Sequence, residues 1–153
     1  MRILIVLLFL CFSGFCQTNT YHISFENAVH HEAKIKATFP DLQENPLTLK
    51  MSRTSPGRYA LHEFAKNVYG LKATNSKGEN LQISRPDPYS WRIENHDGTV
   101  NVEYVLFANR ADGTYSQIDE THAHLNIPAT FIFSEEPFWG FALLPIKLLI
   151  PIL

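Results

Sequence analysis

Hydrophobic and polar residues alternate along several segments of the chain. In the segment HEAKIKATF (31–39), Ala33, Ile35, Ala37 and Phe39 occupy every second position, with Lys or Thr between them. Side chains two residues apart point to the same face of a β-strand. This pattern therefore predicts a strand with one buried face.

The segment 100–107 shows the same period with a more apolar outer side. Alternate positions from Val100 to Leu106 form one apolar face, and Val105 and Phe107 make the other face apolar at one end. This predicts a central strand that is covered on both faces at that end. Shorter patterns predict further strands at 21–25, 47–51, 68–74, 81–83, 91–94, 123–127 and 130–133.

Turn-forming residues separate these segments. Pro, Gly, Asn and Asp gather at 40–41, 75–78, 86–88 and 96–98. Proline fixes φ, glycine accepts positive φ, and Asn or Asp side chains bind nearby backbone groups. The pattern predicts an all-β, mainly antiparallel fold, either a sandwich or a saddle-like sheet, of about seven to nine strands with at most one short helix.

Large aromatic side chains within the predicted strands are expected to form the core rather than a ligand platform. These residues are Tyr21, Phe25, Phe39, Tyr69, Trp91, Tyr104 and Phe107.

The alternation ends in residues 134–153. From Phe138 onward this segment carries one charge, Lys147, and it is interrupted by Pro145 and Pro151. The apolar run is too short and too broken for a good transmembrane helix. We describe residues 134–153 as a divergent apolar tail, distinct from the β-domain predicted for 17–133.

The first sixteen residues have the pattern of a secretory signal peptide. Arg2 precedes an apolar core at 3–12, and small residues allow cleavage between Cys16 and Gln17. Export to the periplasm or the extracellular space is therefore expected. Lipidation of Cys16 is the alternative, although Phe15 is larger than the residue normally found before a lipidated cysteine. Membrane attachment is expected only through such a lipid or through the apolar tail.

Cysteine content and charge exclude several classes of protein. Cys11 and Cys16 both lie in the predicted signal peptide, so a processed chain has no disulfide and depends on a hydrophobic core. The formal net charge of the whole chain is −2, which does not favour nucleic acid as a partner.

Residues 62–66 read His-Glu-Phe-Ala-Lys, which is close to the zinc-binding pattern H-E-x-x-H. That motif needs imidazoles at i and i+4 of a helix, but the last position here is Lys66. An ammonium group cannot replace the missing ligand, and Gly57 and Gly70 leave little room for a helix. We therefore predict no zinc site at His62.

Four blocks of sequence carry a resemblance to a known family. The block SPGRYALHEFAKNVYGLKA, together with YHISFENAVHHEAKI, LTLKM and ETHAHLNIPATF, resembles the N-terminal domain of the glycyl aminopeptidase family, family 61 of the metallopeptidases. The resemblance covers about residues 20–133. Its signature residues here are Ser55, Pro56, Gly57, Tyr59, Glu63 and Phe64.

The resemblance implies a non-catalytic role for this chain. In that family the zinc site lies in a separate helical domain, and the N-terminal β-domain packs on it and helps to enclose the substrate cleft. We therefore expect no enzymatic activity and no cofactor in this chain, and a missing or separate metallopeptidase catalytic domain as its partner. The departure after Phe133 has the character of a frameshift or premature stop. The alternative is a stand-alone exported β-module that binds a peptide or a separate protein partner.

A polar cluster at 117–126 supplies the candidate site. His122, His124 and Asn126 alternate along a predicted strand, so their side chains are expected on one face. They either hydrogen-bond to neighbours at a polar sheet edge or, as the resemblance implies, lie toward the cleft that receives the substrate's N-terminus. No third metal ligand is close in sequence. A second cluster, His30 to Glu32, is interpreted as structural, and Arg58 as a residue that holds a loop or binds a carboxylate.

Overall fold

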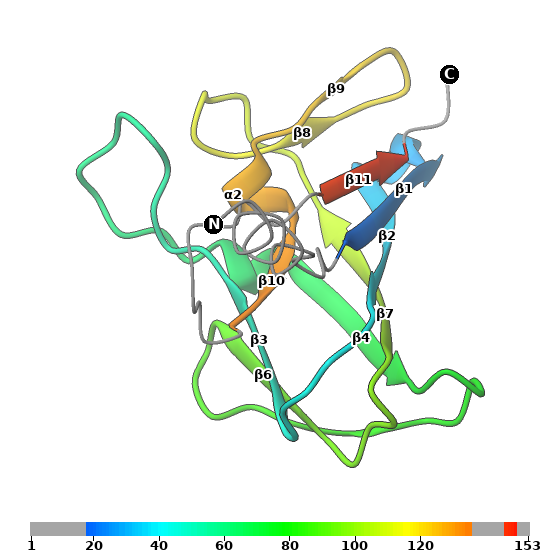
Figure 1. Ribbon diagram of the computed structural model, residues 1–153. Coiled ribbons are helices and arrows are strands. Elements are labelled where there is room, and N and C mark those ends of the chain that lie inside the picture. Colours follow the sequence, from blue (N-terminus) through cyan, green and yellow to red (C-terminus); the bar gives the residue numbers. More distant parts are fainter. Residues whose placement is uncertain (1–17, 136–145, 150–153) are drawn as a thin grey trace, which may run out of the picture.

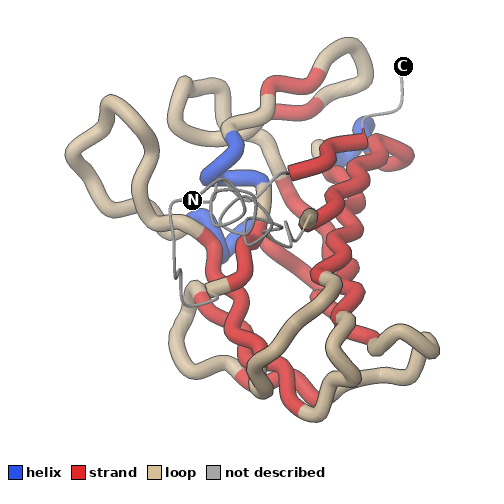
Figure 2. Tube along the Cα trace, in the orientation of Figure 1, coloured by secondary structure: helices blue, strands red, loops and turns tan. Residues whose placement is uncertain are grey.

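A computed structural model describes residues 18–135 and 146–149 of the chain. Most of this part consists of strands and loops, with short helical turns (Figure 2). The predicted signal peptide, including Cys16, lies outside the described residues, as does most of the apolar tail. No helix among the described residues is long and apolar enough to cross a membrane.

The strands form two main sheets and a small hairpin (Figure 1). The larger sheet has the order β11-β1-β2-β7-β4, made by Ile146–Leu149, Asn19–Asn27, Glu32–Phe39, Val100–Phe107 and Val68–Thr74. The smaller sheet has the order β10-β3-β6-β5, made by Ile132–Ser134, Leu47–Met51, Ser90–Glu94 and Gln82–Ser84. The hairpin pairs β8 (Gln117–Ile118) with β9 (Ala123–His124).

Three short helical turns connect these strands. The 3-10 helices η1 (Ala28–His30) and η2 (Phe64–Asn67) precede β2 and β4, and the α-helix α2 (Ile127–Thr130) precedes β10. The predicted all-β, mainly antiparallel class with at most one short α-helix is confirmed for the described residues. Each strand expected from alternation has a counterpart, but the one expected at 123–127 is reduced to Ala123–His124 because Ile127 begins α2, and β8 and β11 are additional.

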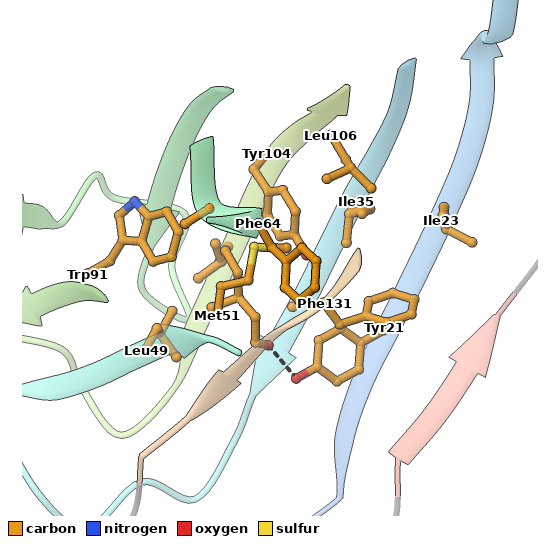
Figure 3. Close-up of a cluster of buried hydrophobic side chains, with 14 of the residues drawn as sticks. Tyr21, Ile23, Ile35, Leu49, Met51, Phe64, Trp91, Tyr104, Leu106 and Phe131 are labelled. Carbon is orange, nitrogen blue, oxygen red and sulfur yellow. Dashed lines mark hydrogen bonds between the residues drawn. The ribbon is translucent and has the colours of Figure 1, made fainter. Parts of the chain in front are cut away.

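Alternation places one face of each sheet in a common core. In β2 the residues at 33, 35, 37 and 39 are buried, and so is the even-numbered face of β7. The two sheets meet in this core (Figure 3), to which one contributes Tyr21, Ile35, Tyr104 and Leu106 and the other Leu49, Met51 and Trp91. Burying each large apolar side chain contributes about 1.5–3 kcal/mol to folding.

Two tyrosine hydroxyls tie the larger sheet to the segment that leads into β10. The Tyr21 hydroxyl donates to the Ile132 carbonyl at 2.7 Å (Figure 3), and the Tyr104 hydroxyl donates to the Thr130 carbonyl at 2.9 Å. Both rings are buried, so these bonds satisfy hydroxyls that water cannot reach. They fix the position of α2 and β10 against the core.

On the outer face of β7, the burial of side chains differs from the sequence-based prediction. Tyr69 and Phe107, expected in the core, are 56% and 38% exposed, and Val105 is only half-buried. Tyr69 lies opposite Val105 on this outer face, because β4 shifts register between Tyr69 and Lys72. The expected cover on both faces of β7 is therefore wrong, whereas Tyr21, Phe39, Trp91 and Tyr104 are buried as predicted.

Part of the apolar tail forms a strand that the sequence pattern does not predict. Residues 146–149 pair in parallel with β1, from Asn19 opposite Ile146 to His22 opposite Leu149. Apolar residues without alternation give no period from which to infer pairing. This strand occupies the edge of β1 that would otherwise be open.

Candidate functional site

A tight turn begins the loop that carries the signature residues. The Arg58 amide donates to the Ser55 carbonyl at 3.1 Å, and Gly57 has a φ of 79°. This is the geometry of a type II turn, in which a residue with a Cβ is strained at the Gly57 position. Residues 55–58 therefore form a tight turn, with Pro56 and Gly57 at its two central positions. We call residues 53–63 the signature loop.

The signature loop projects from the body of the domain (Figure 1). Its ends meet where the His62 amide donates to the Arg53 carbonyl at 2.8 Å, and Arg53 also forms an ion pair with Glu63. Tyr59 is fully exposed and Leu61 is 68% exposed, although both are large and apolar. The loop therefore presents hydrophobic side chains to solvent from a closed base.

The base of the loop is anchored by aromatic contacts. Phe64 is buried, and its ring stacks on His62 with centroids 5.0 Å apart. Tyr115 packs edge-on against both rings, at 4.9 Å from Phe64 and 5.5 Å from His62. The imidazole thus serves as a flat packing surface. Its buried Nε2 has no hydrogen-bond partner among the described residues, nor has the Arg53 Nε.

Asn126 joins the signature loop to two other segments. Its side-chain amide donates to the Ser55 hydroxyl at 3.0 Å and to the Thr114 carbonyl. Its backbone N–H donates to the Ser116 hydroxyl at 3.0 Å. Because Ser116 also bonds to Thr130 at 2.7 Å, the network reaches the end of α2.

A hollow of about 340 Å³ opens beside this network. The signature loop contributes Pro56 to its wall, and the candidate residues His124 and Asn126 also line it. The remaining lining residues are Gly113, Leu125, Ile127 and Pro128. Two groups of residues that are far apart in sequence therefore meet here.

His122 lies elsewhere. It belongs to the turn between β8 and β9, where the Asp119 amide donates to the His122 carbonyl at 3.0 Å. The expected single strand face for His122, His124 and Asn126 is therefore wrong, because the strand at this point has only two residues. The His122 Nδ1 lies 3.2 Å from the Asp119 carboxylate, outside the hollow.

Local hydrogen bonds control the acidic groups near the site. The Thr121 hydroxyl and the amides of Thr121 and His122 donate to Asp119, and they lower the pKa of this carboxyl to about 2. The amide of Thr114 lowers the pKa of Asp112, with smaller contributions from Tyr115 and Arg110. Both carboxylates are thus fixed as turn caps. Among residues 18–135 and 146–149, no group of three or more His, Cys, Asp or Glu side chains is placed to hold a metal ion.

Residues 20–140 match the family model of the Peptidase M61 N-terminal domain, which covers most of the chain. The chain belongs to this family. The match extends past Phe133, where the resemblance in sequence was thought to end. The signature loop, the hairpin and α2 are thus all parts of an M61 N-terminal domain.

Solved structures support the same fold. The crystal structure of an aminopeptidase N family protein from Idiomarina loihiensis is similar with a TM-score of 0.72 and 20% sequence identity, over 76% of this chain. At this identity the likeness shows the fold alone. The M61 N-terminal domain described here spans 20% of the length of that protein. No curated protein matches the chain.

Sequence reasoning missed the residues that hold Asn126. Thr114, Ser116 and Thr130 of the M61 N-terminal domain are all buried, and each takes part in the network. In the sequence Thr114 and Ser116 lie in a polar stretch that resembles an ordinary turn, and Thr130 begins a predicted strand. Their only signal is that Ser and Thr suit positions beside backbone groups that need a partner, which is true of most loops.

Proposed function

We propose that this chain acts as the non-catalytic N-terminal domain of an exported, glycyl-aminopeptidase-like zinc metallopeptidase. Its role is to pack on the catalytic domain and to shape the substrate cleft. Zinc and the groups that activate water belong to the catalytic domain. The signature loop is the docking element, and the hollow at His124 and Asn126 faces the cleft.

The exposed apolar side chains of the signature loop are the observation that carries this proposal. Tyr59 and Leu61 project into solvent from a loop whose base is fixed by Phe64 and Asn126. At the start of α2, Ile127 is 45% exposed and lines the same hollow as Pro56. Exposed apolar residues on a rigid support are typical of surfaces that a partner covers.

The residues that line the hollow support the proposal that it faces the substrate cleft. Asn126 is held from several sides, so its orientation is preset before any ligand arrives, and the exposed imidazole of His124 stands beside it. An imidazole can interact with the N-terminus of a peptide by hydrogen bonding. Preset polar groups in a concave site lose little entropy on binding.

The docking role is tested with a glycyl aminopeptidase catalytic domain purified without its own N-terminal domain. Surface plasmon resonance measures its affinity for this chain and for the double variant Tyr59→Ser, Leu61→Ser. We expect the double variant to bind at least about tenfold more weakly, which corresponds to about 1.4 kcal/mol.

The matched control is Val29→Ser, because Val29 is 57% exposed but lies in η1 and not in the signature loop. It is expected to leave the affinity unchanged. Equal affinity of the signature-loop variant and the unmodified chain, or an equal loss in the Val29 variant, would contradict the proposed docking surface.

Export is tested by expressing the chain from its own first codon in a bacterium. The proposal expects the purified protein to begin at Gln17, as read by N-terminal sequencing. A lipid-modified Cys16 recovered in the membrane fraction would support the lipoprotein alternative instead.

A further inference from the structure

The outer face of the larger sheet carries a cluster of lysines around one carboxylate. Across the strands, Lys36 of β2 lies opposite Glu103 of β7, and Lys72 of β4 lies opposite the same Glu103 on its other side. Lys34 also reaches this carboxylate. Its Nζ lies 3.0 Å from Glu103, and the Nζ of Lys36 lies 3.4 Å from it. Two ammonium groups therefore contact one carboxylate, and a third lysine, Lys72, lies on the neighbouring strand opposite it.

The row beside the lysines consists of hydroxyl and amide groups. Thr38 lies opposite Asn101, and Thr74 lies opposite Asn101 from the other side. The Thr38 hydroxyl donates to the side-chain oxygen (Oδ1) of Asn101 at 2.9 Å, and the side-chain Nδ2 of Asn101 donates to the backbone carbonyl of Asn75 at 3.3 Å. These bonds fix a floor of small polar side chains between two flanking strands.

The lysines and the polar floor line one hollow of about 330 Å³. It is lined by Lys36, Thr38, Lys72, Thr74, Asn80 and Asn101, together with Val102 and Glu103. This volume lies in the range of small-molecule sites. All of its lining residues except Asn80 lie on β2, β4 and β7 of the larger sheet. Figure 1 shows where these strands lie, and no residue that lines this hollow lines the hollow at Asn126.

Positive charge is in excess within this hollow. Partial burial raises the pKa of Glu103, but hydrogen bonds and charges from Lys34 and Lys36 outweigh this effect and lower it, so the carboxylate stays ionised. Its charge is already shared between those two lysines. Lys72 has no ion pair among the described residues, so its ammonium group remains available to an incoming anion.

We propose that this hollow binds a small hydroxylated anion, of the class of sugar acids and sugar phosphates. The carboxylate or phosphate contacts the ammonium groups of Lys36 and Lys72, and the hydroxyls contact Thr38, Thr74 and Asn80. A strongly charged head group explains the lysines, and neutral hydroxyls explain the uncharged polar floor. This site is independent of the docking role, because it uses another surface of the domain.

Nuclear magnetic resonance of the full chain tests this site. Amide resonances are followed during titration with glucuronate, with glucose 6-phosphate, with inorganic phosphate and with glucose. We expect both sugar anions to shift resonances in β2, β4 and β7, and glucose to shift none. The tighter of the two sugar anions identifies the preferred head group. Shifts by glucose equal to those by the sugar anions, or no shifts by either anion at millimolar concentration, would overturn the proposal.

Variants separate a specific site from general attraction to a basic surface. Lys36→Met with Lys72→Met is expected to weaken binding at least tenfold, whereas Lys66→Met, a lysine of η2 outside the hollow, leaves it unchanged. Glu103→Gln removes the competing carboxylate and is expected to strengthen binding several-fold. An equal loss of affinity in the Lys66 variant would overturn the proposal that the anion binds in this hollow. Inorganic phosphate binding as tightly as the sugar anions would overturn the role of the hydroxyl-binding floor.

Discussion

Asn126 shows how a single residue can organise a site in a domain made of strands. Its side chain binds the signature loop at Ser55 and the turn at Thr114, and its backbone binds Ser116. These partners lie in two segments, the signature loop and the turn at 114–116, that no sheet joins to each other. A short amide can bridge them because it offers two donors and an acceptor from one rigid group.

Replacing Asn126 by Ala is expected to lower the free energy of unfolding by about 1–3 kcal/mol, since partly buried partners lose their hydrogen bonds. Urea unfolding followed by circular dichroism measures this change. Asn109→Ala is the control, because Asn109 is exposed and no side-chain hydrogen bond is found for it among the described residues. A loss in the control as large as in Asn126→Ala would show that the network has no special role.

The buried tyrosines make stability sensitive to alkaline pH. Burial raises the pKa of Tyr21 and of Tyr104 well above the ordinary value of 10.0. The neutral hydroxyl is thus favoured in the folded state, and the stabilisation is present below pH 10 and is lost as the pH rises above it. Each tyrosine is expected to lower the free energy of unfolding by about 1.4 kcal/mol per pH unit there.

Tyr21→Phe is expected to reduce this alkaline slope while it costs about 1 kcal/mol at neutral pH for the lost bond to Ile132. Unfolding in urea at pH 9, 10 and 11 measures both effects. Tyr59→Phe is the control, because Tyr59 is fully exposed. If the free energy of unfolding falls equally steeply above pH 10 in the Tyr21 variant and in the unmodified chain, Tyr21 is not a source of the alkaline sensitivity.

At the scale of elements, alternation of apolar and polar residues predicts most of the strands of the two main sheets. β2 and β7 are found as expected because burial on one face requires the period of two that they show. In the hairpin β8–β9, the pattern misses β8 and makes β9 too long, since each strand has only two residues and their pairing depends on the turn between them. His122 was misplaced for this reason.

The candidate site was predictable only in part. His124, Asn126 and Pro56 were singled out from sequence blocks, and the structure brings them to one hollow. The contact between them depends on the signature loop folding back at Arg53 and His62, which is a tertiary contact without a local pattern. The exposure of Tyr69 and Phe107 likewise depends on which face of the sheet receives a second layer.

Asp119 is expected to hold the hairpin turn through its ionised form. Because its pKa is lowered to about 2, the stabilisation is present above an ordinary pKa of about 3.9 and is lost as the pH falls from there toward about 2. Asp119→Ala is therefore expected to loosen the turn at neutral pH and to differ less from the unmodified chain near pH 2. Amide hydrogen exchange at residues 117–124 measures this effect.

Glu120→Ala is the matched control for the same turn, because Glu120 is exposed and makes no hydrogen bond or ion pair described for this turn. Its exchange rates are expected to follow those of the unmodified chain at every pH. A carboxyl titration midpoint for Asp119 near 4, measured by nuclear magnetic resonance, would show that the Asp119 carboxylate is not held by these hydrogen bonds.

At the scale of the whole molecule, the two sheets leave different surfaces for different partners. The signature loop and α2 form the apolar surface that we assign to docking, and the outer face of β2, β4 and β7 forms the basic hollow. Because the core between the sheets is continuous, both surfaces rest on the same rigid support. Substitutions at one surface are expected to be additive with those at the other.

Removing residues 136–153 takes away β11 and leaves one edge of β1 unpaired. Open strand edges pair with other chains, so the truncated protein is expected to self-associate. Sedimentation equilibrium measures the association constant. The control is the same truncation with Thr20→Lys and His22→Lys, because charges on an edge strand oppose pairing. A truncated chain that stays monomeric would contradict the role of β11 as an edge cover.

The hydrogen bond from Tyr21 to Ile132 joins residues that are 111 positions apart in the sequence, one near the beginning of the domain and one near its end. The ribosome synthesises Tyr21 early and Ile132 late. The pairing of β3 with β10 likewise cannot form until β10 has been synthesised. During most of its synthesis the nascent chain therefore lacks the partners of Tyr21 at Phe131 and Ile132. Contacts of such long range form slowly and late. The domain is expected to fold after its translation rather than during it.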